Sequence, residues 1–124
     1  MFDNLKALGA LSGLMKNKEK IAESAKRVRD ELASARVSGE AGGGIVRAVV
    51  SGDMRLISVE ISPALGAGIG ASESDRAMAS ALIAEAVNDA LTRARGVAQE
   101  AIRRETEALG LPADLGGMGA ELFR

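Results

Sequence analysis

The side chains of this sequence that could do chemistry are basic ones near its N-terminus. Lys16 and Lys20 are four residues apart, and Lys26, Arg27 and Arg29 follow within the next turns of the same predicted helix. Ammonium and guanidinium groups at this spacing can contact successive phosphates, so the stretch could follow a nucleic-acid backbone. Acidic residues stand between them, and a solvated helix face with ordinary ion pairs explains the pattern equally well.

Two further pairs of basic residues lie near the C-terminal end of the sequence. Arg93 and Arg95 are followed, about three turns later on a second predicted helix, by Arg103 and Arg104. They are weaker candidates for phosphate contact, because several glutamates stand close by. An acidic segment repels a phosphate backbone unless its arginines share one face.

The charges of the chain are unevenly distributed, although the net charge is −1. Residues 1–36 carry eight basic and five acidic side chains, residues 37–72 carry two and three, and residues 73–124 carry six and nine. There are two Phe residues and no Trp or Tyr, so bases have almost nothing to stack on. Any nucleic-acid binding should therefore depend on phosphates, and it should be modest and sensitive to salt.

Most enzymatic chemistry is excluded by the absence of Cys and His. Without them the chain has no disulfide, thiolate nucleophile, Cys/His metal site or imidazole base. The run from Gly42 to Gly44 lacks the Lys-Ser/Thr ending of a nucleotide-binding loop. Asn88 and Asp89 are adjacent on a helix and point about 100° apart, which favours a structural role. We expect no catalytic residue, no cofactor, no metal and no small-molecule substrate, and hence no enzyme.

The sequence also predicts a protein without a membrane-spanning segment. Its longest uncharged runs, residues 7–15 and 61–72, are far shorter than the roughly 20 apolar residues that span a bilayer. The N-terminus lacks the uninterrupted apolar stretch and the cleavage site of a signal peptide. A location in the cytoplasm is the corresponding expectation.

The basic N-terminal residues are positioned by a helix predicted over residues 2–35. Its apolar residues recur at heptad-like intervals, at Leu11, Leu14, Ile21, Ala25, Val28, Leu32 and Ala35. Lys18 falls on this stripe where an apolar residue is expected. Gly9 and Gly13 weaken the first turns by roughly 1 kcal/mol each relative to Ala, so the best helix is expected to start near Lys16.

Three short β-branched segments follow, at residues 36–41, 45–50 and 54–61. Glycine-rich connections separate them, the first of which we interpret as a flexible hairpin loop. This pattern predicts an antiparallel meander. Residues 64–71, with three glycines, are predicted to form a soft linker.

A second long helix is predicted from Ser72, which is suited to cap it, to about Leu109. Its stripe has a period near 3.6 and consists of Met78, Leu82, Ala86, Ala90, Val97, Ala101 and Ala108. The predicted fold is therefore α+β, in the order helix, three-stranded antiparallel meander, helix. We expect one domain over residues 1–110 and a flexible tail over residues 111–124. Because two helices cannot cover both edges of the sheet, a homodimer is expected.

Several segments together resemble the YbaB/EbfC family of nucleoid-associated proteins. The most specific are residues 37–44, Val-Ser-Gly-Glu-Ala-Gly-Gly-Gly, and residues 86–90, Ala-Val-Asn-Asp-Ala. Val59-Glu60-Ile61 followed by Pro63, the Leu14-Met15-Lys16 segment and the Phe-containing C-terminus agree with the same pattern. The resemblance spans almost the whole chain.

The resemblance implies a homodimer whose sheets join through the middle segment and whose long helices project like the arms of tweezers. It implies binding of duplex DNA in the nucleoid, with little sequence preference, through basic side chains of these arms. The DNA-binding residues are then expected to be Lys16, Lys20, Lys26, Arg27, Arg29, Arg93, Arg95, Arg103 and Arg104. The alternative is a protein-interaction module whose helical arms clamp a partner protein.

Overall fold

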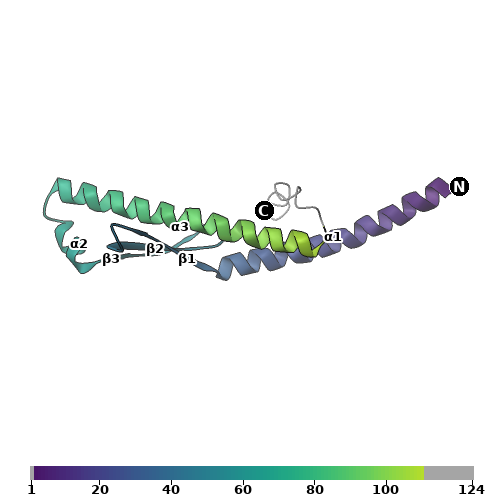
Figure 1. The fold of residues 1–124 in the computed structure, drawn as a ribbon, viewed down its shortest axis with the longest axis horizontal. Helices are drawn as coiled ribbons and strands as arrows, with labels where there is room; N and C mark the ends of the chain where they lie inside the picture. The colour runs from purple at the N-terminus through teal and green to yellow at the C-terminus, as the bar shows by residue number, and fades with distance from the viewer. Residues whose placement is uncertain (1, 111–124) are drawn as a thin grey trace. The chain divides into compact units, whose positions relative to one another are not determined.

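The computed structural model describes the backbone of residues 2–110 and the side chains of residues 17–110. Its elements are, in chain order, α1 (Phe2–Ser34), β1 (Arg36–Ala41), β2 (Val46–Ser51), β3 (Leu56–Ile61), α2 (Pro63–Gly68) and α3 (Glu73–Ala108) (Figure 1). The α+β class and the order helix, antiparallel sheet, helix agree with the prediction. The tail expected at residues 111–124 lies outside the described residues.

The described chain forms two compact units. The helix-pair unit contains residues 2–30 of α1 and residues 101–110, which include the end of α3. The sheet unit contains residues 31–100, with the three strands, α2 and the greater part of α3. Each long helix therefore contributes to both units.

The sheet is the predicted meander, with strand order β1-β2-β3 and antiparallel neighbours. Its β1–β2 turn is built by Gly42, Gly43 and Gly44, whose φ angles of 63°, 70° and 97° lie in the left-handed region that glycine tolerates. The connection that we interpreted as a flexible hairpin loop is a glycine turn in the structure. It places Glu40 opposite Arg47, and Arg47 is opposite Glu60 on β3.

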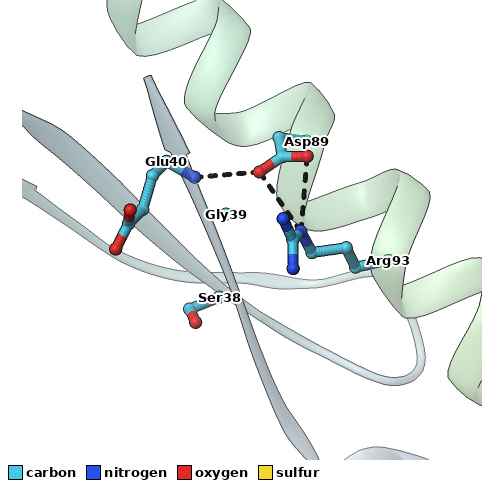
Figure 2. A pocket seen from close by; sticks show the side chains of 5 residues that line it. All are labelled: Ser38, Gly39, Glu40, Asp89 and Arg93. Carbon is cyan, nitrogen blue, oxygen red and sulfur yellow. Dashed lines mark hydrogen bonds and ion pairs between the residues drawn. The ribbon is translucent and has the colours of Figure 1, made fainter. Parts of the chain in front are cut away.

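One very close contact of the sheet unit joins β1 to α3. A Cβ atom at Gly39 would lie 2.2 Å from the backbone nitrogen of Ala90 and 2.6 Å from the carbonyl oxygen of Ala86. Helix and strand backbones therefore meet directly, which requires glycine on the strand and small residues on the helix. Beside this contact, the Glu40 backbone N–H donates to Asp89 Oδ2 at 3.0 Å (Figure 2).

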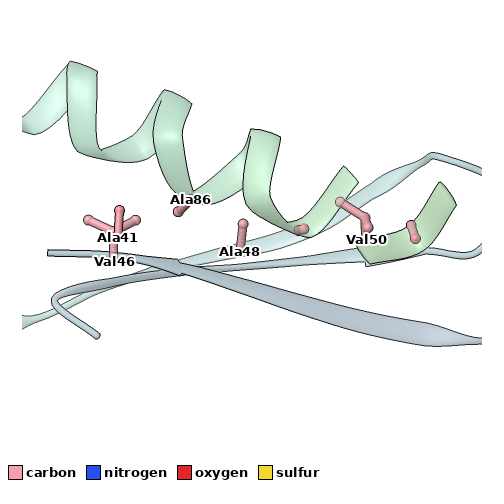
Figure 3. Packing of buried hydrophobic residues seen from close by; sticks show 7 residues of the cluster. Ala41, Val46, Ala48, Val50 and Ala86 are labelled. Atoms are coloured by element: carbon pink, nitrogen blue, oxygen red, sulfur yellow. The ribbon is translucent and has the colours of Figure 1, made fainter. Parts of the chain in front are cut away.

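The core of the sheet unit lies between α3 and the face of the sheet that this helix covers (Figure 3). Along the first part of β2, buried side chains alternate with more exposed ones, so that every second side chain points towards the helix. The buried cluster consists of Ala41, Val46, Ala48, Val50, Ala86, Ala90 and Ala94. Such small side chains bury little apolar area each, so stability depends on close packing.

The third strand, in contrast, is largely uncovered. β3 forms one edge of the sheet, and Leu56, Ile57 and Ile61 are 52%, 47% and 36% exposed. Only Val59 is partly buried against the core cluster. An apolar edge strand of this kind is a ready surface for association with another chain.

The segment predicted to be a soft linker contains the short helix α2. Ser62 caps this helix, since its hydroxyl accepts the backbone N–H of Leu65 at 3.3 Å, and Pro63 occupies its first turn. Leu65 packs against the core cluster. The prediction of a soft linker was wrong because it relied on the three glycines of the segment. It did not take into account the Ser62 cap and the apolar contact of Leu65.

The N-terminal helix spans nearly the whole predicted range, residues 2–35. α1 is helical from Phe2, through Gly9 and Gly13, although the sequence favoured a start near Lys16. The predicted stripe is confirmed where side chains are described, since Ala25 and Val28 are buried and Ile21 and Leu32 are partly buried.

The predicted stripe of α3 is only partly confirmed. Met78 and Val97 are 54% and 41% exposed and Ala108 is also exposed, whereas Ala79 and Ala94, absent from the predicted stripe, are buried. Alanines occur on several faces of α3, so the phase of its buried stripe is set by the contact with β1 rather than by the sequence period. Its predicted start is confirmed: Ser72 accepts the backbone N–H of Asp75 at 3.1 Å.

Replacement of Gly39 by Ala is expected to destabilise the protein by about 1–3 kcal/mol or more, because the new Cβ overlaps backbone atoms of α3 that cannot move aside. Gly96→Ala is the matched control. Gly96 is helical with open space around its Cα, so alanine there should stabilise by about 0.5–1 kcal/mol. Urea unfolding monitored by circular dichroism measures both effects; equal stability of the two variants would contradict the close contact.

Candidate nucleic-acid interface

The helix-pair unit is held together by a polar contact centred on Glu105. Ser24 Oγ donates to Glu105 Oε2 at 2.9 Å, and Arg27 Nη2 contacts the same oxygen at 3.2 Å. Arg27 Nη2 also donates to Ser24 Oγ at 3.0 Å. Ser24 is fully buried and the Glu105 side chain is 20% exposed. This contact therefore binds α1 to the end of α3.

The same contact sets the protonation of its members. Hydrogen bonds from Arg27 and then from Ser24 stabilise the charged carboxylate, and they lower the pKa of Glu105. The hydrogen bond and charge of Glu105 in turn raise the pKa of Arg27. Arg27, expected from the sequence to contact DNA, is thus already engaged by a carboxylate.

The other predicted cations of α1 differ from Arg27. Lys20, Lys26 and Arg29 are exposed, and none forms an ion pair within the described part of the chain. We call these three residues the open cations. The side chain of Lys16 lies outside the described residues.

The predicted arginines of α3 are more often engaged. Arg93 Nε lies 3.3 Å from Asp89 Oδ2, and Arg103 Nη1 lies 2.7 Å from Glu107 Oε1. Arg104 and Arg95 are exposed. Among the predicted residues whose side chains are described, Arg27, Arg93 and Arg103 are therefore held by carboxylates, whereas Lys20, Lys26, Arg29 and Arg95 are exposed without a described ion pair.

Asp89 has the structural role that the sequence favoured. Its carboxylate accepts the Glu40 backbone N–H and the Arg93 guanidinium, which lower its pKa in that order of importance. Figure 2 shows these groups around a polar pocket of about 180 Å³ lined by Ser38, Gly39, Glu40, Asp89 and Arg93. Asp89 therefore accepts a hydrogen bond from the Glu40 backbone N–H of β1, which is the strand at one edge of the sheet.

Lys18 is a basic residue of α1 that the sequence analysis did not include among its candidates for DNA contact. Because it falls on the heptad-like stripe of α1, its position suggested a place for an apolar residue, yet it is exposed and forms no ion pair among the described residues. Its spacing from Lys26, two helical steps of four residues, was the signal that could have revealed it.

Within the described residues, no helix is long and apolar enough to cross a membrane. Over the same residues, no three His, Cys, Asp or Glu side chains are grouped so that they could hold a metal ion.

Residues 8–109 match the model of the YbaB/EbfC DNA-binding family. The chain belongs to this family. It is 34% identical over 107 residues to a nucleoid-associated protein of Pseudomonas fluorescens (strain Pf0-1), in an alignment that covers 86% of this chain and 94% of the relative. The fold resembles the crystal structure of an uncharacterized protein from Helicobacter pylori, with a TM-score of 0.57 and 17% identity over 73% of this chain and 86% of that one.

The two segments that carried the resemblance to the YbaB/EbfC family are in contact in the structure. Residues 37–44 contain Gly39 and Glu40, and residues 86–90 contain the alanines and Asp89 that meet them. The family pattern in this chain is thus explained by packing of α3 on β1, and it is separate from the basic residues considered for DNA contact.

The contribution of Glu105 to stability should depend on pH. Because its pKa is lowered in the folded protein, its stabilising effect is complete above the unfolded value of about 4.3 and is lost as the pH falls through the folded pKa. Glu105→Gln should therefore lower the free energy of unfolding at pH 7. The difference in this free energy between the variant and the wild type should shrink as the pH falls below the unfolded pKa and through the folded pKa of Glu105.

Urea unfolding between pH 7 and pH 3 measures this dependence. Glu107→Gln is the control, because its ion pair with Arg103 is about half exposed and should contribute little. A Glu105→Gln deficit that stays constant with pH would contradict the role of the charged carboxylate.

Proposed function

We propose that this protein binds duplex DNA as a homodimer, with little sequence preference, through basic side chains of its long helices. In this proposal it acts in the nucleoid, within the cytoplasm, as a chromosome-organising protein without chemistry of its own. Membership of a DNA-binding family supports the proposal, as does the name of the Pseudomonas fluorescens relative, a nucleoid-associated protein.

The observation that carries the proposal is the set of open cations on α1. Lys20, Lys26 and Arg29 are exposed and lack a carboxylate partner within the described chain, so a phosphate can approach them without breaking an ion pair. Lys16 and Arg95 are further candidates. Arg27, Arg93, Arg103 and Arg104 already interact with other groups of the protein, which they would first have to leave or share with a phosphate.

Little sequence preference follows from the same chemistry. Phosphate contacts position a protein on a duplex but carry no base information. The chain has no Trp or Tyr to stack on bases. Binding should therefore be governed by counterion release, which is common to all sequences.

The homodimer is supported by the uncovered third strand. β3 pairs with β2 on one side, and no described strand pairs with its other side. Its leucine and isoleucines are among the most exposed apolar residues of the described chain. A second copy placed against β3 would satisfy its free backbone groups and remove these side chains from water.

DNA binding should be strong only at low salt. A dimer that makes six phosphate contacts would lose about a thousandfold in affinity between roughly 50 and 200 mM salt. Fluorescence anisotropy of labelled duplexes, one rich in A·T and one rich in G·C pairs, measures this dependence. Similar affinities for the two duplexes are expected, and absence of binding at the lower salt concentration would favour the protein-interaction alternative instead.

Light scattering should give a mass twice that of one chain at micromolar concentration. The double change Leu56→Lys and Ile57→Lys places charges on the exposed part of β3 and should produce monomers. Met78→Lys is the control, because Met78 is similarly exposed but lies on α3. A wild-type mass of one chain, or a β3 double variant that remains dimeric and folded, would contradict this interface.

A further inference from the structure

One line of residues on α1 combines three cations with no acidic side chain. Lys18, Ala22, Lys26 and Arg29 follow one another at steps of four, four and three residues, which places them on one face of the helix. All four are exposed. With a rise of about 1.5 Å per residue, Lys18 and Lys26 are separated by about 12 Å along the axis, and Lys26 and Arg29 by about 4.5 Å.

The residues beside this line do not offer a comparable surface. Glu19, Glu23 and Asp30 form an acidic line of their own, at steps of four and seven residues, next to the cations around the helix. Beyond the acidic line lie Arg27, which is held by Glu105 and Ser24, and Lys20, which is seven residues or about two turns from Arg27. The acidic line therefore separates these two cations from the first line.

We propose that Lys18, Lys26 and Arg29 form the main phosphate-contacting line of α1. The inference rests on the proposed DNA binding and specifies how it occurs. The ligand is the sugar-phosphate backbone of duplex DNA, and the short side chain of Ala22 leaves room for the backbone to approach the helix between the cations. Arg27 is a positioning residue, which holds α1 against the end of α3 and contacts no phosphate.

The geometry accounts for this choice in electrostatic terms. None of the three cations has an ion-pair partner in the described chain, so each can release a counterion from DNA when it binds. The acidic line beside them repels phosphates and restricts the approach of the duplex to the flank that carries the cations. This arrangement allows binding by a chain whose net charge is −1.

The test compares two triple variants that remove the same charge. The line variant carries Lys18→Ala, Lys26→Ala and Arg29→Ala, and the control variant carries Arg47→Ala, Arg55→Ala and Arg76→Ala. All six residues are exposed, and none has a described ion-pair partner. Circular dichroism and light scattering establish that both variants keep the fold and the mass of the wild type.

The readout is the slope of log affinity against log salt concentration for a labelled duplex. Each phosphate contact contributes about −0.9 to this slope, so the magnitude of the slope should fall by about 2.7 in the line variant for each α1 helix that contacts the duplex. The control variant should keep the wild-type slope. Lys18→Ala alone should reduce the magnitude by about 0.9 per contacting helix.

A second measurement uses the neighbouring acidic line. The double change Glu19→Gln and Glu23→Gln should tighten DNA binding at low salt, because it removes repulsion beside the cations. Unchanged or weaker binding by this double variant would contradict the placement of DNA on this flank.

Two results overturn the proposal in different ways. Equal slopes for the line and control variants would mean that only total charge matters, and DNA binding would stand without this line. Absence of wild-type binding at low salt would overturn the proposed function and this inference with it. A smaller salt-dependence slope in the line variant alone supports both the proposed DNA binding and the phosphate-contacting line.

Discussion

The direct contact between the backbones of β1 and α3 at Gly39 is the constraint on which the sheet unit depends. A strand and a helix can approach so closely only where no Cβ separates them, and the helix must offer alanines on the facing side. The core is consequently made of Ala and Val, with few large side chains. Because the buried cluster draws its strand residues from β1 and β2, the third strand keeps an apolar edge without a cover.

Carboxylates of this protein hold its structure together at two places. Asp89 joins the Glu40 backbone of β1 to α3, and Glu105 joins Ser24 and Arg27 of α1 to the end of α3. In each place the carboxylate also engages an arginine. Formal net charge is a poor guide to the surface, because charges are unevenly distributed along the chain, and Lys18, Lys20 and Lys26 of α1 are exposed without a described ion pair.

The features that identify the family and the features proposed to bind DNA are physically distinct. Residues 37–44 and 86–90 form the contact between β1 and α3, and this contact tolerates few substitutions for steric reasons. The cations of α1 lie on an exposed surface in the helix-pair unit, where many arrangements of charge are compatible with the fold. The segments that identify the family are therefore explained by the packing of α3 on β1. The cations proposed to contact DNA are not part of these segments.

The sequence by itself determined the class, the order and most of the boundaries of the elements. These follow from local periodicity, β-branched segments, glycine turns and the Ser72 cap, all of which act over a few residues. It also determined which chemistry is excluded, because a chain without Cys or His cannot use thiolates or imidazoles. The resemblance to the YbaB/EbfC family depended on short segments that can be read without coordinates.

Only the tertiary structure decided which side chains of these elements are buried, engaged or open. The phase of α3 could not be read from a helix with alanines on several faces, and Met78 and Val97 were wrongly placed in its stripe. The engagement of Arg27 depends on Glu105, which is 78 residues away in the sequence. Lys18 occupies a position at which the stripe of α1 predicts an apolar residue, and only the structure shows that its side chain is exposed. Contacts between distant segments set these properties, and no local pattern in the sequence records them.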